Sequence, residues 1–106
     1  MSSDNLGYTW EKLMVAVHGM ASSPRSMQQR IADAYTGSLM RLKADDFPDD
    51  LRWTFEAISK KLTTGTPTGD EGTVQASVSS MSEEEASEIA REIVNLYDQI
   101  SARYRA

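Results

Sequence analysis

The last quarter of the chain, residues 82–104, contains the pattern that most constrains the fold. Small and apolar side chains recur there at steps of four, three, four, three and four residues: Ala86, Ala90, Ile93, Tyr97, Ile100 and Tyr104. This spacing keeps side chains on one side of an α-helix. Ser82 and Glu85 precede them in the order S-x-x-E, a capping box that pairs the free backbone donors of a helix start. The sequence therefore predicts a helix over residues 83–104.

The width of the apolar face of this helix predicts a central position in the molecule. Ile89, Val94 and Leu96 widen the apolar arc to about 160° on a helical wheel. A two-stranded coiled coil needs only a narrow stripe, whereas a wide arc suits a helix that packs against several neighbours. A dimer seam along the same helix is the alternative.

Three earlier stretches show the same helical spacing, the first of them over residues 8–21. Their apolar faces contain, in chain order, Trp10, Leu13, Val17 and Met20; Met27, Ile31, Ala34, Ser38 and Leu42; and Leu51, Phe55, Ile58 and Leu62. Pro24 and Pro48 are predicted at first helical positions, where the missing N–H costs nothing, and Ser23 is predicted as the N-cap of the second helix. Gly37 marks a point where the second helix can bend or end early.

Residues 63–81 connect the third pattern to the last one. Residues 63–72 contain three glycines and a proline, and we predict a loop there. Residues 73–81 fit either a short helix or a strand, and we favour the helix because the chain offers no second strand to pair with it. The predicted fold class is all-α: a compact bundle of about five helices in a single domain, residues 1–106, with a flexible N-terminus over residues 1–7.

Composition excludes several kinds of chemistry. The 106 residues include no cysteine, so the chain can form no disulfide, thiolate nucleophile or cysteine-ligated metal site. His18 is the only histidine, which rules out a catalytic triad or a histidine-rich metal site built by this chain alone. We therefore expect no enzyme, no cofactor and no metal. Neither a signal peptide nor an apolar run of membrane-spanning length is visible, and we expect a cytoplasmic protein without a membrane partner.

The charged clusters have a structural interpretation. Carboxylates gather around predicted helix starts, at Asp45, Asp46, Asp49 and Asp50 and again at Glu83, Glu84 and Glu85. Lys60, Lys61, Arg103 and Arg105 fall at predicted helix ends. Both placements complement the helix macrodipole. The glycine-rich loop lacks the lysine of a phosphate-binding loop, so we read it as a connection.

Trp53 is the residue that the helical patterns leave unexplained. It lies about 200° around its helix from Leu51, away from the predicted core face. Tryptophan is enriched at protein interfaces, although another helix or the N-terminal tail would be an alternative cover for it. We predict a protein–protein interaction or adaptor module, monomeric or homodimeric, with an unidentified partner whose basic character the acidic side chains would favour. The candidate partner-binding residues are Trp53 and, more weakly, Met40, Tyr8 and Val15.

The alternative function is a small DNA-binding transcriptional regulator that uses the second helix. A tight turn at residues 23–24 would join it to the first helix, as in a helix-turn-helix motif. The side chains that would contact a duplex are Arg25, Gln28, Gln29, Arg30 and Arg41. Asp33 and the net charge of −5 oppose this function, because DNA phosphates repel an acidic protein. The chain resembles small bacterial helical proteins in general, and no motif identifies a family.

Overall fold

The computed structural model describes residues 6–67 and 72–105. All regular structure in these ranges is helical and includes no strand: α1 (Leu6–Ser22), α2 (Met27–Gly37), α3 (Asp49–Lys61), α4 (Gly72–Ser79) and α5 (Glu83–Arg105), with the single-turn 3-10 helices η2 (Leu39–Arg41) and η3 (Ala44–Asp46) between α2 and α3. The predicted all-α bundle is confirmed. Of the segments expected to be irregular, residues 1–5 and 68–71 lie outside the described residues, and Leu6 and Gly7 already belong to α1.

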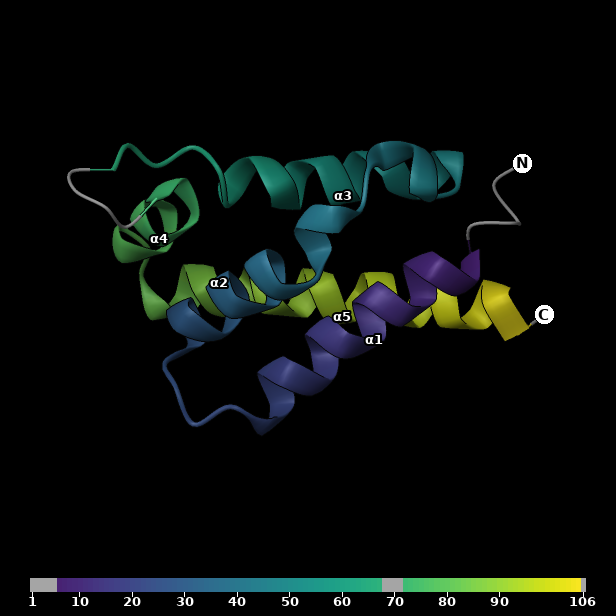
Figure 1. The fold of residues 1–106 in the computed structure, drawn as a ribbon, viewed down its shortest axis with the longest axis horizontal. Coiled ribbons are helices and arrows are strands. Elements are labelled where there is room, and N and C mark those ends of the chain that lie inside the picture. The colour runs from purple at the N-terminus through teal and green to yellow at the C-terminus, as the bar shows by residue number, and fades with distance from the viewer. Residues whose placement is uncertain (1–5, 68–71, 106) are drawn as a thin grey trace.

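The C-terminal helix is central, as its wide apolar arc predicts. α5 runs the length of the molecule and packs against α1, α2 and α3 (Figure 1). Ile93 and Ile100 are fully buried on the face that meets these neighbours. The capping box also forms: Ser82 N donates to Glu85 Oε1 over 2.8 Å, and Glu85 N donates to Ser82 Oγ over 3.0 Å. The buried side of this helix therefore packs against α1, α2 and α3 of the same chain.

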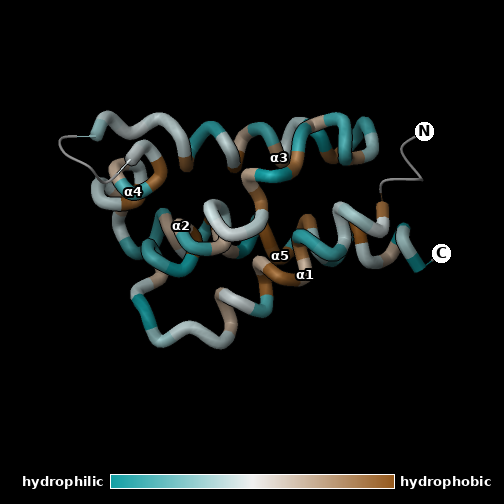
Figure 2. The backbone as a smooth tube through the Cα atoms, in the orientation of Figure 1, coloured by the Kyte–Doolittle hydropathy of each residue, from teal (hydrophilic) through white to brown (hydrophobic). Residues whose placement is uncertain are grey.

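The core occupies the space between α5, α1, α2 and α3, and the hydrophobic segments in Figure 2 gather where α1, α5 and the connection after α2 meet. Its largest fully buried side chains are Phe47, Leu13, Ile31, Leu39, Ile58 and Leu62. Phe47, which precedes α3, stacks on Phe55 with ring centroids 4.5 Å apart. This stack fixes the buried side of α3.

The start of α2 differs from the prediction. Ser26, not Ser23, is the N-cap, and its Oγ accepts from Gln29 N over 3.1 Å. Ser23 Oγ accepts instead from Arg25 N over 3.1 Å, a local turn that keeps Pro24 outside the helix. Pro48 likewise stands one position earlier than predicted, as the residue before α3. Serine and proline in the sequence thus locate the start of a helix to within one helical turn. Which residue is the N-cap depends on the hydrogen bonds that the competing side chains form.

The second helix is also shorter than its apolar spacing suggests, because it ends at Gly37. Leu39 and Leu42 remain buried, but η2 rather than a continuous α-helix places them there. Ser38 Oγ donates to Lys12 O over 2.6 Å, and Thr9 Oγ1 donates to Asp46 O over 2.7 Å. These two bonds attach the connection between α2 and α3 to α1.

The ambiguous residues after the glycine-rich segment form the helix α4, as predicted. Ser77 connects α4 to the incoming chain: its Oγ accepts from Gly65 N over 2.8 Å and donates to Thr73 O over 2.8 Å. Gly65 packs so closely on α4 that a Cβ there would overlap the backbone of Ser77. Within the described ranges, no helix combines the length and apolar character that a membrane span requires.

Candidate partner-binding surface

Trp53 stands on the outer face of α3 with 77% of its surface exposed, more than any other large hydrophobic side chain that the structure describes. Leu51, Phe55 and Ile58 are buried on the opposite side of the helix. In residues 6–67 and 72–105, Trp53 has no hydrogen bond, ring contact or covering helix. The prediction that Trp53 lies outside the core face is therefore confirmed.

The surroundings of Trp53 are acidic. Asp49, Asp50 and Glu56 lie three or four residues from Trp53 along α3, the spacing at which helical side chains are neighbours. Between residues 44 and 56 the chain has five carboxylates and one basic residue, Arg52. Arg52 is already paired, because its Nη1 lies 2.8 Å from Asp49 Oδ1 and its Nε donates to Phe47 O over 3.0 Å. We call Trp53 with Asp49, Asp50 and Glu56 the α3 face.

A cross-helix ion pair holds one edge of the α3 face. Arg103, near the end of α5, donates through Nη1 and Nη2 to the two carboxylate oxygens of Asp50, each over 2.7 Å. The hydrogen bonds from Arg103 hold the pKa of Asp50 below its ordinary value of 3.8, and the same bonds raise the pKa of Arg103. The pair therefore fixes the position of the Asp50 carboxylate at the edge of the α3 face.

The other candidate residues are also exposed, at 45% for Tyr8, 48% for Val15 and 54% for Met40. Tyr8 and Val15 are seven residues apart and share the outer side of α1, where Lys12 Nζ lies 5.3 Å from the Tyr8 ring centroid. Met40 is in η2, which packs on α1. The four residues thus divide between α3, which carries Trp53, and the α1–η2 region, which carries the other three.

Two exposed apolar residues were not among the candidates. Val94 is 38% exposed and Tyr104 is 49% exposed. Tyr104 follows the buried spacing of α5, but it lies in the last turn, where one side of its ring stacks on Trp10 at 5.6 Å and the rest faces solvent. Helical spacing alone misplaces it, because a core stripe at a helix end has fewer neighbours to cover it.

The polar residues of the second helix are largely engaged within the chain. Gln28 Nε2 donates to Met81 O over 3.2 Å, and Gln29 exchanges two side-chain hydrogen bonds with Gln75 of α4, at 3.1 and 3.2 Å. Arg25 lies before α2 and pairs with Asp33 over 3.2 Å. Arg30 and Arg41 donate to backbone carbonyls of Arg25 and Gly37. α4 therefore occupies part of the surface that a recognition helix would need.

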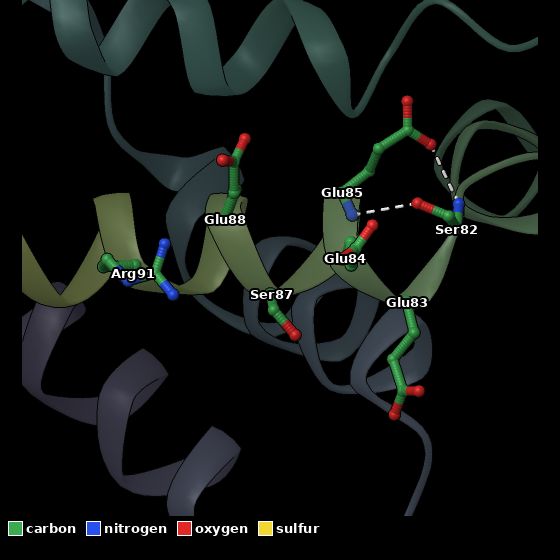
Figure 3. A pocket seen from close by; sticks show the side chains of 7 residues that line it. All are labelled: Ser82, Glu83, Glu84, Glu85, Ser87, Glu88 and Arg91. Carbon is green, nitrogen blue, oxygen red and sulfur yellow. Dashed lines mark hydrogen bonds between the residues drawn. The ribbon is translucent and has the colours of Figure 1, made fainter.

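One depression follows the first turns of α5 (Figure 3), and its lining residues are Ser82, Glu83, Glu84, Glu85, Ser87, Glu88 and Arg91. Ser82 and Glu85 are used there in the capping box. Among the residues that the structure describes, no group of three or more His, Cys, Asp or Glu side chains is arranged to hold a metal ion.

Comparison of the chain with protein-family models, with curated proteins and with solved structures found no match.

Proposed function

We propose that this protein is an interaction module that binds a basic segment of another protein through the α3 face. The proposal rests mainly on one observation, the 77% exposure of Trp53. The packing of α3 does not use this side chain, since Leu51, Phe55 and Ile58 supply its buried contacts. Exposed tryptophan of this kind is favoured where a partner covers it, because it buries a large area with few rotatable bonds.

The acidic surroundings indicate the chemistry of the partner. A lysine or arginine side chain can lie over the indole face and be attracted by the ring. Glu56 makes no ion pair within the described chain, and it lies one turn from Trp53. Asp49 and Asp50 are held in place by Arg52 and Arg103. Such a cluster would speed the approach of a basic segment and repel an acidic one.

The test is titration of the protein with defined helical peptides, one rich in lysine and arginine and one rich in glutamate. The Trp10→Phe variant leaves Trp53 as the only indole, so its emission reports binding directly. We expect the basic peptide alone to shift the emission. Trp53→Ala, followed by calorimetry, should weaken binding by about 2 kcal/mol, or roughly thirtyfold.

Met40→Ala is the matched control, because Met40 is exposed on a different element. It should change the affinity for the basic peptide by less than about threefold. Equal affinity of both peptides, or an unchanged affinity in Trp53→Ala, would contradict the proposal.

A DNA-binding regulator that uses α2 is the second candidate function. The contacts of Gln28 and Gln29 with Met81 and α4 weigh against it. DNA binding of this kind would weaken steeply with added salt. A mobility-shift assay at low salt with mixed genomic fragments tests it, and we expect no shift at micromolar protein. A shift that disappears in the Arg25→Ala/Arg30→Ala variant would favour the regulator instead.

A further inference from the structure

A second apolar surface follows the contact between α1 and α5, away from the α3 face. The two helices run antiparallel, with Trp10 Nε1 donating to Ser101 Oγ over 2.9 Å and Gly7 packed against the Tyr104 ring. Apolar side chains along this contact are only partly covered by the rest of the chain. We call the following residues the α1–α5 strip: Trp10, Met14, Val17, Val94, Tyr97 and Tyr104.

The strip has charged flanks with matching spacing on both helices. On α5, Arg91 lies three residues before Val94 and Asp98 four residues after it. On α1, Glu11 lies three residues before Met14 and His18 four residues after it. All four flanking side chains are exposed, and none forms an ion pair within the described chain. Each helix therefore has an apolar centre with an acidic group on one side and a basic group on the other.

When a second copy of the helix lies antiparallel to the first, the acidic flank of each copy faces the basic flank of the other. A two-fold axis across the helices, near Val94, places Arg91 of one copy opposite Asp98 of a second copy, and the reverse pairing follows by symmetry. The same operation places Glu11 opposite the His18 imidazole of the second copy. Both pairs are seven residues apart, or about 10.5 Å along a helix. Opposite charges thus meet at two places between the α5 helices, beside the apolar centre, and Glu11 faces His18 at two places between the α1 helices.

One axis can serve both helices. The contacts of Trp10 with Ser101 and of Gly7 with Tyr104 set the register of α1 against α5. In this register, the midpoint between Glu11 and His18 lies about 3 Å along the helices from the midpoint between Arg91 and Asp98, at 1.5 Å per residue. A slight tilt of the axis covers that difference.

We propose that two copies of this chain associate through their α1–α5 strips, α1 against α1 and α5 against α5, in an antiparallel two-fold dimer. The partner that fits the strip is a second copy of the chain, because Arg91 and Asp98 of one copy lie opposite Asp98 and Arg91 of an antiparallel copy. α3 packs on another side of α5, so both α3 faces stay free in the dimer. The dimer does not depend on what the α3 face binds.

The test is the molar mass of the chain by sedimentation equilibrium over a concentration series, with circular dichroism to check the fold of each variant. We expect a reversible monomer–dimer equilibrium. Val94→Glu should raise the dissociation constant by more than about tenfold, since it places two carboxylates near the axis. Glu88→Arg, an exposed position on α5 outside the strip, is the control and should leave the constant within about threefold.

Exchanging the charges of Arg91 and Asp98 tests whether these two residues contact each other across the dimer or act only through the net charge of the chain. Arg91→Asp alone and Asp98→Arg alone should each weaken the dimer by about tenfold, because each places like charges in contact twice. The combined Arg91→Asp/Asp98→Arg variant should restore the parent constant, since the reversed pair is again complementary. A parent that is monomeric at all concentrations, or a combined variant no tighter than the single ones, would overturn the proposal.

Discussion

Arg103 and Asp50 are 53 positions apart in the chain, yet the guanidinium donates to both carboxylate oxygens of Asp50 over 2.7 Å. Arg103 lies in the last turn of α5 and Asp50 in the first turn of α3, the two places where these charges complement a helix macrodipole. Because α3 positions Trp53, this pair connects the central helix to the proposed binding surface.

The pair predicts a pH-dependent contribution of Asp50 to stability. The pKa of Asp50 is lowered in the folded state, so its contribution is present above the unfolded value of 3.8 and is lost as the pH falls through the folded value. Asp50→Asn should therefore lower the melting temperature at about pH 7 and have no effect once the pH is below the folded pKa.

The measurement is the difference in melting temperature between parent and variant across a pH series. Asp45→Asn removes an exposed carboxylate that has no ion pair in the described chain, and it is the control. A difference that stays constant to the lowest pH would show that the loss comes from something other than the charge of Asp50.

A second prediction concerns the buried face of α5. Ile93 is fully buried, so Ile93→Asp would place a carboxylate in the core without a partner. We expect a loss of at least about 3 kcal/mol in the free energy of unfolding, measured by urea denaturation. Asn95→Asp, two residues away on the exposed side, should stay within about 0.5 kcal/mol. Similar losses for both variants would mean that the assigned face is wrong.

Replacement of glycine by alanine should lower the free energy of unfolding at Gly65 but not at Gly19. Gly65→Ala would drive a methyl group into the backbone of α4 at Ser77, and we expect a loss of about 1–3 kcal/mol. At Gly19, inside α1, a Cβ would meet nothing within 4 Å. Gly19→Ala should therefore be neutral or gain up to about 1 kcal/mol from its higher helix propensity. Urea denaturation measures both, and a loss at Gly19 equal to that at Gly65 would contradict the close contact.

The two tryptophans should differ in fluorescence. Trp53 is exposed, whereas Trp10 is partly buried, bonded to Ser101 and stacked near Tyr97 and Tyr104. In the Trp10→Phe variant, the remaining emission should lie at longer wavelength and be quenched more strongly by acrylamide than in Trp53→Phe. Equal quenching of the two variants would mean that Trp53 is covered in solution, and the α3 face would then lose its main support.

Features that depend on neighbouring residues or on helical periodicity are predictable from the sequence. The capping box at Ser82 and Glu85, the apolar face around Ile93 and the exposure of Trp53 all follow from spacing along one helix, and the structure has each of them. The N-cap of α2 was predicted at the wrong serine, because Ser23 Oγ accepts from the nearby Arg25 N, whereas Ser26 Oγ accepts from Gln29 N inside the helix.

Features that need contacts between distant residues were not visible in the sequence. η2 and η3 depend on bonds from Ser38 to Lys12 and from Thr9 to Asp46, and no local pattern encodes either. The pairing of Asp50 with Arg103 is likewise not predictable from the sequence, because each charge is sufficiently explained by its position at a helix end. Whether the four candidate residues form one patch depended on the arrangement of α1, η2 and α3 in space.

The packing of α1 on α5 also has a consequence for the order of events during synthesis. α1 is made before α5, and α5 is its most extensive packing partner, so the native contacts of α1 are incomplete until residues 83–105 have emerged from the ribosome. During that interval Leu13, Ala16 and Met20 are not yet covered by α5. A chaperone that recognises apolar helices would bind them at this stage. Completion of the fold is thereby linked to translation of residues 83–105, and nascent chains arrested before that point should be especially sensitive to proteases.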